Sequence, residues 1–198
     1  MDATPVTRMP GRPRSATVDQ RILDVTIQQL VERGYDAMSI EGIATAAGVG
    51  KTTIYRRYPG KRELVVGALS SIAASLQPPP DTGDARADLR AFVRQTFGVF
   101  RQDGLGFAMI GTLLVRERED PELMERFRAE VIRPRIEAAT AILRRGVERG
   151  EVRWDVRIDV VVQMVAGALF ARHVAGQPED DAWVEAVFEI LWEGAAAR

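Results

Sequence analysis

"AAGVGKTTIYRRYPGKREL", residues 46–64, decides the fold because it allows two interpretations. Residues 50–52 look like the end of a phosphate-binding loop, G-x-x-x-x-G-K-[ST], whereas residues 54–58 look like a helix that lies in a DNA groove. A phosphate-binding loop needs a glycine five places before Gly50 and a buried strand ahead of it. Thr45 stands at that place, and the segment before it has the apolar spacing of a helix. The phosphate-loop interpretation therefore fails both requirements.

A helix-turn-helix explains the same letters. Its first helix must pack closely, which suits the small Ala44, and its turn needs a residue that tolerates positive φ, which suits Gly48. Its second helix must bury one apolar side chain, which suits Ile54. The other positions of this helix can then reach phosphates or base edges: Lys51, Thr52, Thr53, Tyr55, Arg56 and Arg57. The alternative is a plain helical hairpin.

Lysine usage points to the same place. The chain has 27 basic residues, but only Lys51 and Lys61 are lysines, and they flank the second helix of the motif. Charge is also uneven along the sequence: residues 1–62 hold ten basic and six acidic side chains, a net +4, whereas residues 63–198 hold 17 and 22, a net −5. The N-terminal part is suited to a polyanion, although chance scatter of solvated charge is the alternative.

Helical periodicity extends in both directions from this stretch. An apolar stripe begins after Thr17 and ends at Gly34, Ser39 is a good N-cap for the next helix, and Pro59 with Gly60 ends the third. "QPPPDTGD", residues 77–84, is a linker because three consecutive prolines cannot lie inside a helix. Further apolar helical segments follow, with a break or kink at Pro134 and an extended turn at "RGEVRWDVRID". The sequence predicts an all-α fold, with an N-terminal three-helix helix-turn-helix domain joined to a larger helical domain.

Composition excludes several classes of function. There is no cysteine for a disulfide or thiolate site, and the lone His173 rules out a His-rich metal site and is better explained as a surface or interface residue. No Ser-His-Asp set and no glycine-rich nucleotide loop indicate catalysis, so we expect neither an enzyme nor a cofactor. The sequence has no signal peptide and no apolar run long enough to span a membrane, which predicts a cytoplasmic protein with no membrane partner.

Residues 17–65 resemble the tetracycline-repressor (TetR) family of bacterial transcription regulators. The resemblance rests on the first helix "RILDVTIQQLVERGYDAMSIEGIA", the turn glycine, the Ile54–Tyr55 pair, the second aromatic Tyr58, and Lys61 at the family's spacing. Residues 84–198 are similar to the family's divergent effector domain in length, helix count and apolar character. The implied organisation is a flexible basic arm at 1–16, a DNA-binding domain at 17–62 and an effector-binding and dimerisation domain at 63–198.

The resemblance implies a homodimer on a palindromic double-stranded DNA operator, a repressor released by a small apolar effector. Ser39, Tyr55 and Lys61 match phosphate-contacting positions, while Lys51, Thr52, Thr53 and Arg56 match positions that reach bases or the nearby backbone. Gly50 departs from the family's usual serine or threonine. We add Arg57 and Tyr58 as DNA-binding candidates, and Arg12 and Arg14 as an arm for the minor groove, with a merely solvated tail as the alternative.

Two further sets of residues are candidates in the C-terminal part. Aromatic and methionine side chains suit an apolar effector pocket, although each one alone is more easily explained as core: Phe97, Phe100, Phe107, Met109, Leu113, Phe127 and Met164. Apolar stripes on the last two helices suit a dimer seam, with internal core as the alternative: Val165, Leu169, Phe170, Val184, Val187, Phe188, Leu191 and Trp192. The other functions left open are a helical protein-interaction module and a nucleotide-binding switch that uses Gly50, Lys51 and Thr52.

Overall fold

The computed structural model describes residues 14–75, 78–101 and 105–197. In this part the chain is all-helical, apart from an isolated antiparallel bridge between Val152 and Ala196. The helices are α1 (Arg14–Ala37), α2 (Ile40–Ala47), α3 (Lys51–Tyr55), α4 (Lys61–Ser75), α5 (Ala85–Arg101), α6 (Leu105–Arg116), α7 (Pro121–Phe127), the π-helical turn η2 (Arg128–Ile132), α8 (Arg133–Glu148), α9 (Ile158–Val174) and α10 (Asp181–Ala195). The expected all-α class is confirmed.

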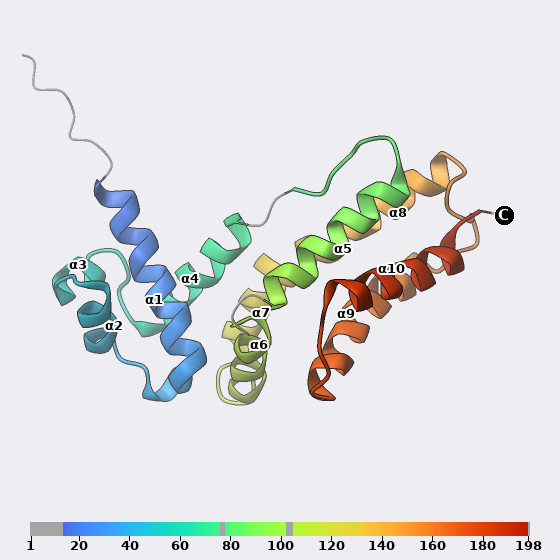
Figure 1. The fold of residues 1–198 in the computed structure, drawn as a ribbon. Coiled ribbons are helices and arrows are strands. Elements are labelled where there is room, and N and C mark those ends of the chain that lie inside the picture. Colours follow the sequence, from blue (N-terminus) through green and yellow to red (C-terminus); the bar gives the residue numbers. More distant parts are fainter. Residues whose placement is uncertain (1–13, 76–77, 102–104, 198) are drawn as a thin grey trace, which may run out of the picture.

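The molecule is elongated, with α1 to α4 at one end and α5, α8, α9 and α10 at the other (Figure 1). Helices α6 and α7 lie between these groups: α6 contacts α1 and α5, and α7 contacts α4, α6 and η2. We call α1 to α4 the head and α5 to α10 the body. The C-terminus lies at the tip of the body farthest from the head.

Local signals position the head helices as the sequence indicated. Gly34 interrupts α1 with φ 74°, and the Ser39 hydroxyl caps α2 by accepting a hydrogen bond from the Gly42 N–H at 3.1 Å. Gly48 ends α2 in the left-handed region, with φ 64°. The third helix is shorter than expected, because it ends at Tyr55 rather than at Tyr58.

The kink expected at Pro134 is a π-helical turn that immediately precedes α8. Proline has no N–H to donate to the preceding turn, so the helix widens there instead of stopping. The chain therefore runs from α7 through η2 into α8 without leaving a helical path.

Two hydrophobic clusters hold the fold together. One joins the head helices to α6, α7 and η2 through Met109, Leu113, Leu123 and Phe127. The other joins α5, α8, α9 and α10 and includes Phe107 from α6. The domain boundary expected after residue 62 remains a prediction, but apolar packing crosses it, because the inner face of α4 is buried in the first cluster.

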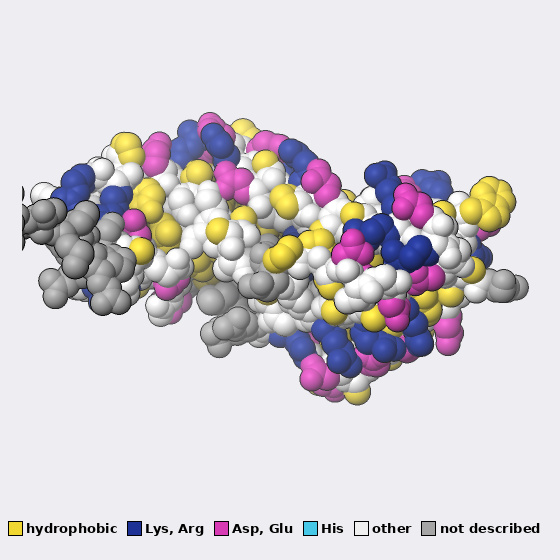
Figure 2. Space-filling model, turned by 90° about the horizontal axis from the view of Figure 1, so that it is seen from above, with side chains coloured by type: hydrophobic (Ala, Val, Ile, Leu, Met, Phe, Trp, Pro, Cys, Tyr) yellow, Lys and Arg dark blue, Asp and Glu magenta, His cyan; other side chains and the backbone are white. Residues whose placement is uncertain are grey.

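Ion pairs reinforce the contact between α5 and α10. Arg86 pairs with Glu189 at 2.6 Å, and Arg90 and Arg94 each pair with Glu185 at 2.8 Å. Figure 2 shows the resulting surface, on which basic and acidic side chains are interspersed over the body. Exposed pairs of this kind stabilise a fold only weakly, so the apolar cluster beneath them dominates the stability of the body.

Candidate functional site

The α2–turn–α3 unit has the geometry of a helix-turn-helix. Ile54 is fully buried and anchors α3 against the head, while Ala44 and Ala47 provide the close-packed face of α2. A helix precedes Gly50, where a phosphate-binding loop would need a strand. Gly50 is the N-cap of α3, but it has no side chain to satisfy the first N–H groups of that helix. These groups remain available to an anion.

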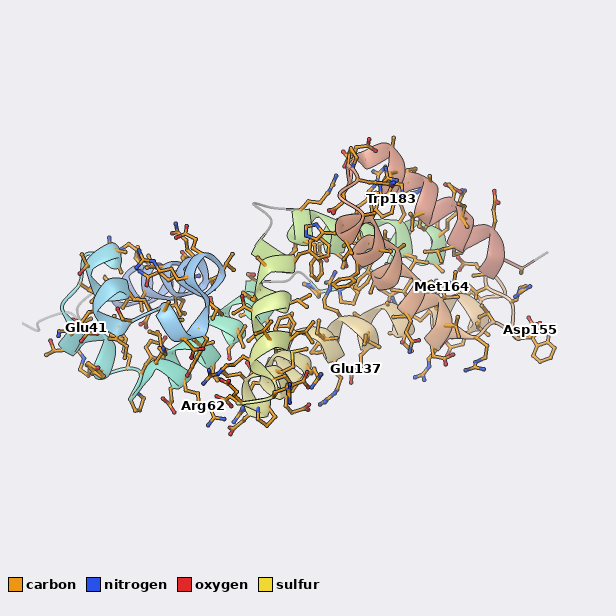
Figure 3. All side chains as sticks on the ribbon, turned by 90° about the horizontal axis from the view of Figure 1, so that it is seen from below. Glu41, Arg62, Glu137, Asp155, Met164 and Trp183 are labelled. Carbon is orange, nitrogen blue, oxygen red and sulfur yellow. The ribbon has the colours of Figure 1, made fainter. Side chains whose placement is uncertain are left out.

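The outer face of α3 carries most of the expected DNA-reading side chains. Lys51, Thr52, Tyr55 and Arg56 are exposed, and Thr53 is half-buried. The ammonium group of Lys51 lies 3.0 Å from Glu41 Oε1, and this hydrogen bond lowers the pKa of the Glu41 carboxyl group. Figure 3 shows Glu41 on the outer edge of the head, at the end remote from the body. A DNA phosphate would compete with Glu41 for Lys51.

Lys61 and Arg57, which were also expected to contact DNA, instead form polar contacts within the head. Lys61 Nζ donates to the carbonyl oxygens of Tyr35, Asp36 and Met38 at 2.6, 3.2 and 3.1 Å, which uses all three of its N–H donors. Arg57 pairs with Asp19 at 2.6 Å.

The ring of Tyr58 packs over Gly67, where an added Cβ would lie 2.6 Å from Tyr58 Cε1. Like Lys61 and Arg57, Tyr58 has contacts that favour a structural role. Ser39 is also used structurally, as the N-cap of α2.

The expected arm lies mainly outside the described residues. Arg12 is not among them, and Arg14 is described only as the first residue of α1. Sequence reasoning missed Arg21, an exposed residue of α1 beside the turn: a Cβ added at Gly48 would lie 4.0 Å from Arg21 Nη2. Only the fold brings these positions together, since 27 residues separate them in the sequence.

The body encloses a largely apolar cavity of about 260 Å³. Its walls come mainly from α5, α8 and α9, and it reaches Ile72 of α4 and Met109 of α6. Three of the seven expected pocket residues line it: Phe100, Met109 and Phe127. The cavity therefore extends from the centre of the body to the helices that contact the head.

The structure corrects the other four pocket candidates. Phe97 is fully buried and stacks on Trp183, with ring centroids 5.7 Å apart, and Phe107 stacks on His173 at 3.8 Å. Leu113 is buried in the head-side cluster. Met164 does not line the cavity and is 52% exposed; Figure 3 labels it on α9. Helices α6 and α9 are apolar on more than one side, so spacing alone did not identify their cavity face.

Arg135 is the polar feature of the cavity that sequence reasoning missed. Its guanidinium group donates to Gln95 Oε1 at 3.1 Å and to the Thr96 hydroxyl, and its central carbon lies 4.1 Å from the centroid of the Phe92 ring. Burial lowers the pKa of Arg135. The sequence gives little signal for this position, because it lies in the arginine-rich segment "RPR" after a surface helix.

Helices α6 and α7 connect the cavity to the head. Arg62, at the start of α4, pairs with Asp120 at 3.0 Å and also with Glu122, both at the α6–α7 junction. Arg116, at the end of α6, pairs with Asp36 of α1 at 2.7 Å. Figure 3 shows Arg62 where the head meets α6 and α7. The "RERED" segment is thus a helix end and turn, as expected, and also a contact surface between head and body.

Most residues of the expected dimer seam are buried in the core of the body, and the position of the seam remains a prediction. Six of its eight residues are less than 10% exposed and belong to the body core: Val165, Leu169, Val184, Phe188, Leu191 and Trp192. Val187 is half-buried, and Phe170 is 47% exposed. A different stripe on α9 is exposed at a spacing of four and three residues: Val160, Met164, Gly167, Ala171 and Val174. On α10 the exposed small and apolar residues are Ala182, Ala186, Ile190 and Gly194.

The described residues include neither a membrane-spanning helix nor a cluster of potential metal ligands. None of these helices combines the length and hydropathy needed to cross a bilayer. No group of three or more potential metal ligands comes together in the same part of the chain.

A helix-turn-helix head joined to a helical body with a cavity is the architecture of a helix-turn-helix transcription regulator. Two family models match the sequence: "Bacterial regulatory proteins, tetR family" over residues 22–68, and "Tetracyclin repressor-like, C-terminal domain" over residues 79–191. The chain belongs to the TetR family of bacterial transcription regulators. This is a family of regulators rather than enzymes, as the sequence indicated.

Individual relatives agree with this assignment. A protein of Mycobacteroides abscessus named DNA-binding transcriptional repressor TetR is 35% identical, over 88% of this chain and 89% of its own. HTH-type transcriptional regulator AqdR of Rhodococcus erythropolis is 33% identical, over 78% and 73% of the two chains. The crystal structure of TetR family transcription regulator SCO0332 is 31% identical, with a TM-score of 0.64 and coverage of 89% and 97%.

Proposed function

We propose that this protein is a ligand-responsive transcriptional repressor that binds a palindromic operator as a homodimer and is released by a small, mainly apolar effector. The observation that carries the proposal is the combination of an exposed, cationic α3 with a cavity that reaches the helices contacting the head. The M. abscessus relative is named a repressor, which supports this direction of regulation. A DNA-binding role also favours a cytoplasmic location.

On the DNA side, we propose that Lys51, Thr52, Tyr55 and Arg56 contact the operator, with Thr53 at the edge of this surface. Cationic and hydroxyl groups on one short helix can reach both phosphates and base edges in a major groove. We propose Arg21 as an added phosphate contact, since it lies beside the turn. Arg57, Tyr58 and Lys61 instead hold the head together, and Ser39 starts α2.

For dimerisation, we propose the exposed stripe of α9 together with the exposed face of α10. Met164, Val174 and Ile190 are 52%, 71% and 69% exposed, which is a large apolar area for a single chain to leave in water. Small residues between them, such as Gly167 and Ala171, allow two helices to approach closely. A two-fold pair built on this face would present two α3 helices to one operator.

A ligand bound in the cavity would change DNA binding through α6 and α7. A ligand can shift the equilibrium between DNA-competent and spread arrangements only if it binds one of them more tightly. Met109 and Phe127 line the cavity and also belong to the cluster that includes the head. Filling the cavity would therefore displace side chains against which α1 and α4 pack.

The experiment is a selection of bound sequences from a random double-stranded DNA library, followed by salt-titrated affinity measurements. We expect a palindrome whose half-sites lie about one helical turn, roughly 34–36 Å, apart, with affinity that falls steeply as salt rises. Arg56→Ala should relax the preferred sequence. The proposal would be overturned if no sequence is enriched and the protein binds random DNA as tightly as selected DNA at every salt concentration.

A further inference from the structure

Arg135 is the one cationic side chain among the described residues that line the cavity. Apart from Thr96 and Gln163, its neighbours in the wall present only hydrocarbon side chains or backbone. An apolar ligand that displaces water from such a wall is stabilised there. A guanidinium group in the same wall, however, is stable only if it keeps polar partners.

Described contacts fix the position of the Arg135 side chain without neutralising it. Gln95 and Thr96 accept one hydrogen bond each, and the face of Phe92 lies beneath the guanidinium carbon at 4.1 Å. These partners are uncharged. Arginine has five N–H donors, so up to three remain for a ligand.

The absence of a carboxylate distinguishes Arg135 from its neighbours on the body surface. Arg90 and Arg94 of α5 both pair with Glu185 at 2.8 Å. No carboxylate among the described residues forms an ion pair with Arg135, and burial is the one cause of its lowered pKa. The charge is therefore partly desolvated without a counterion, which is a costly arrangement unless an anion completes it.

We infer that the effector is a compact apolar molecule with one carboxylate group, which Arg135 binds through paired N–H donors. This inference rests on the proposed function, because it takes the cavity as the effector site. A planar carboxylate matches the planar fork of a guanidinium group, and the held orientation of Arg135 reduces the entropy lost on binding. The apolar walls then hold the rest of the molecule.

The cavity limits the size of this ligand. Its volume of about 260 Å³ lies near the lower end of small-molecule sites, which range over roughly 300–1,000 Å³. A cavity at this end of the range suits a small ligand rather than a long-chain one or one of more than two rings. A medium-chain or bicyclic aromatic monocarboxylic acid has this size.

The test compares acids with neutral amides of the same shape in isothermal titration calorimetry of the full chain. The pairs are octanoate with octanamide, and 1-naphthoate with 1-naphthamide. We expect wild-type protein to bind at least one acid about tenfold or more tightly than its amide, because a carboxylate accepts two parallel hydrogen bonds from the guanidinium group and neutralises its charge, whereas an amide offers one carbonyl oxygen and no charge. Arg135→Gln should weaken binding of the acid much more than binding of the amide, and so reduce this preference to about twofold or less.

Two further variants complete the design. Arg135→Lys keeps the charge but lacks the planar fork, so it should retain part of the preference. Arg144→Gln removes an exposed arginine from the same helix and should leave the preference unchanged. Melting curves followed by circular dichroism check that each variant is folded.

Three outcomes would overturn the inference: equal binding of acid and amide by the wild type, a preference that survives Arg135→Gln, or no binding of either pair. Operator affinity without ligand separates this result from the proposed function. Arg135→Gln should bind the selected operator like wild type, because Arg135 lies in the body, far from α3. A wild type that selects no operator contradicts the repressor proposal whatever the calorimetry shows.

Discussion

At the scale of single residues, Lys61 and Arg56 are two nearby cations with different surroundings. Lys61 donates to three carbonyl oxygens near the end of α1, whereas Arg56 is exposed on α3. Lys61→Met removes these charge-assisted bonds, so we expect the free energy of unfolding to fall by about 1–3 kcal/mol. Arg56→Met should leave stability within about 0.5 kcal/mol of wild type and weaken DNA binding.

The measurement is urea unfolding of both variants together with the slope of log affinity against log salt for a fixed operator. Each lost phosphate contact lowers the magnitude of that slope by about 0.9. A homodimer carries the substitution in both subunits, so loss of an Arg56–phosphate contact should lower the magnitude of the slope by about 1.8, whereas Lys61→Met should not change it. A reduced slope with unchanged stability in Lys61→Met would show instead that Lys61 contacts DNA.

At the scale of elements, the end of α8 meets the start of α5 at Gly146. A Cβ added there would lie 2.7 Å from Val152 Cγ2 and 2.8 Å from the Ala85 Cβ. Gly146→Ala should therefore destabilise the body by about 1–3 kcal/mol through overpacking, despite the better helix propensity of alanine.

Gly98 of α5 is the matched control, since nothing lies within 4 Å of its added Cβ. Gly98→Ala should be neutral or stabilising by up to about 1 kcal/mol. Thermal unfolding of the two variants under the same conditions is the measurement. A Gly146→Ala protein as stable as Gly98→Ala would show that α5 and Val152 can move apart at no cost.

The two ends of α2 could be predicted from the sequence because their signals are local, whereas α3 ends three residues before the expected Tyr58. Ser39 and Gly48 each act through their own backbone and near neighbours, so one sequence was enough to position α2 and the turn. The cavity and the dimer face depend on which side of a helix is covered. Helix α9 is apolar almost all round, so its periodicity could not distinguish the buried Val165 from the exposed Met164.

At the scale of the whole molecule, the exposed face of α9 and α10 predicts the oligomeric state. Met164→Arg would place a charge at the centre of the proposed seam, where burial without a partner costs on the order of 2 kcal/mol or more, or roughly 30-fold in the dimer dissociation constant. Trp154→Arg is the control, because Trp154 is 88% exposed and belongs to the turn before α9 rather than to α9 or α10.

Sedimentation equilibrium at several protein concentrations measures the effect. We expect a dimer for wild type and Trp154→Arg, and a larger monomer fraction for Met164→Arg. The same variant should bind a single half-site but lose the gain in affinity from a second one. If Met164→Arg remains as dimeric as wild type, the seam lies on another face.

The route of the chain between head and body has a further consequence. Segment 78–84 is fixed to the body at the end remote from the head: Arg145 of α8 pairs with Asp81 at 3.2 Å and donates to the carbonyl oxygen of Pro80 at 3.1 Å (Figure 1). The backbone tether thus reaches the body far from the surface where α6 and α7 meet the head. Its main effect is to set the effective concentration of one part near the other. The orientation of the head on the body is therefore set by the buried side-chain packing of α1 and α4 against α6, α7 and η2, and not by the linker.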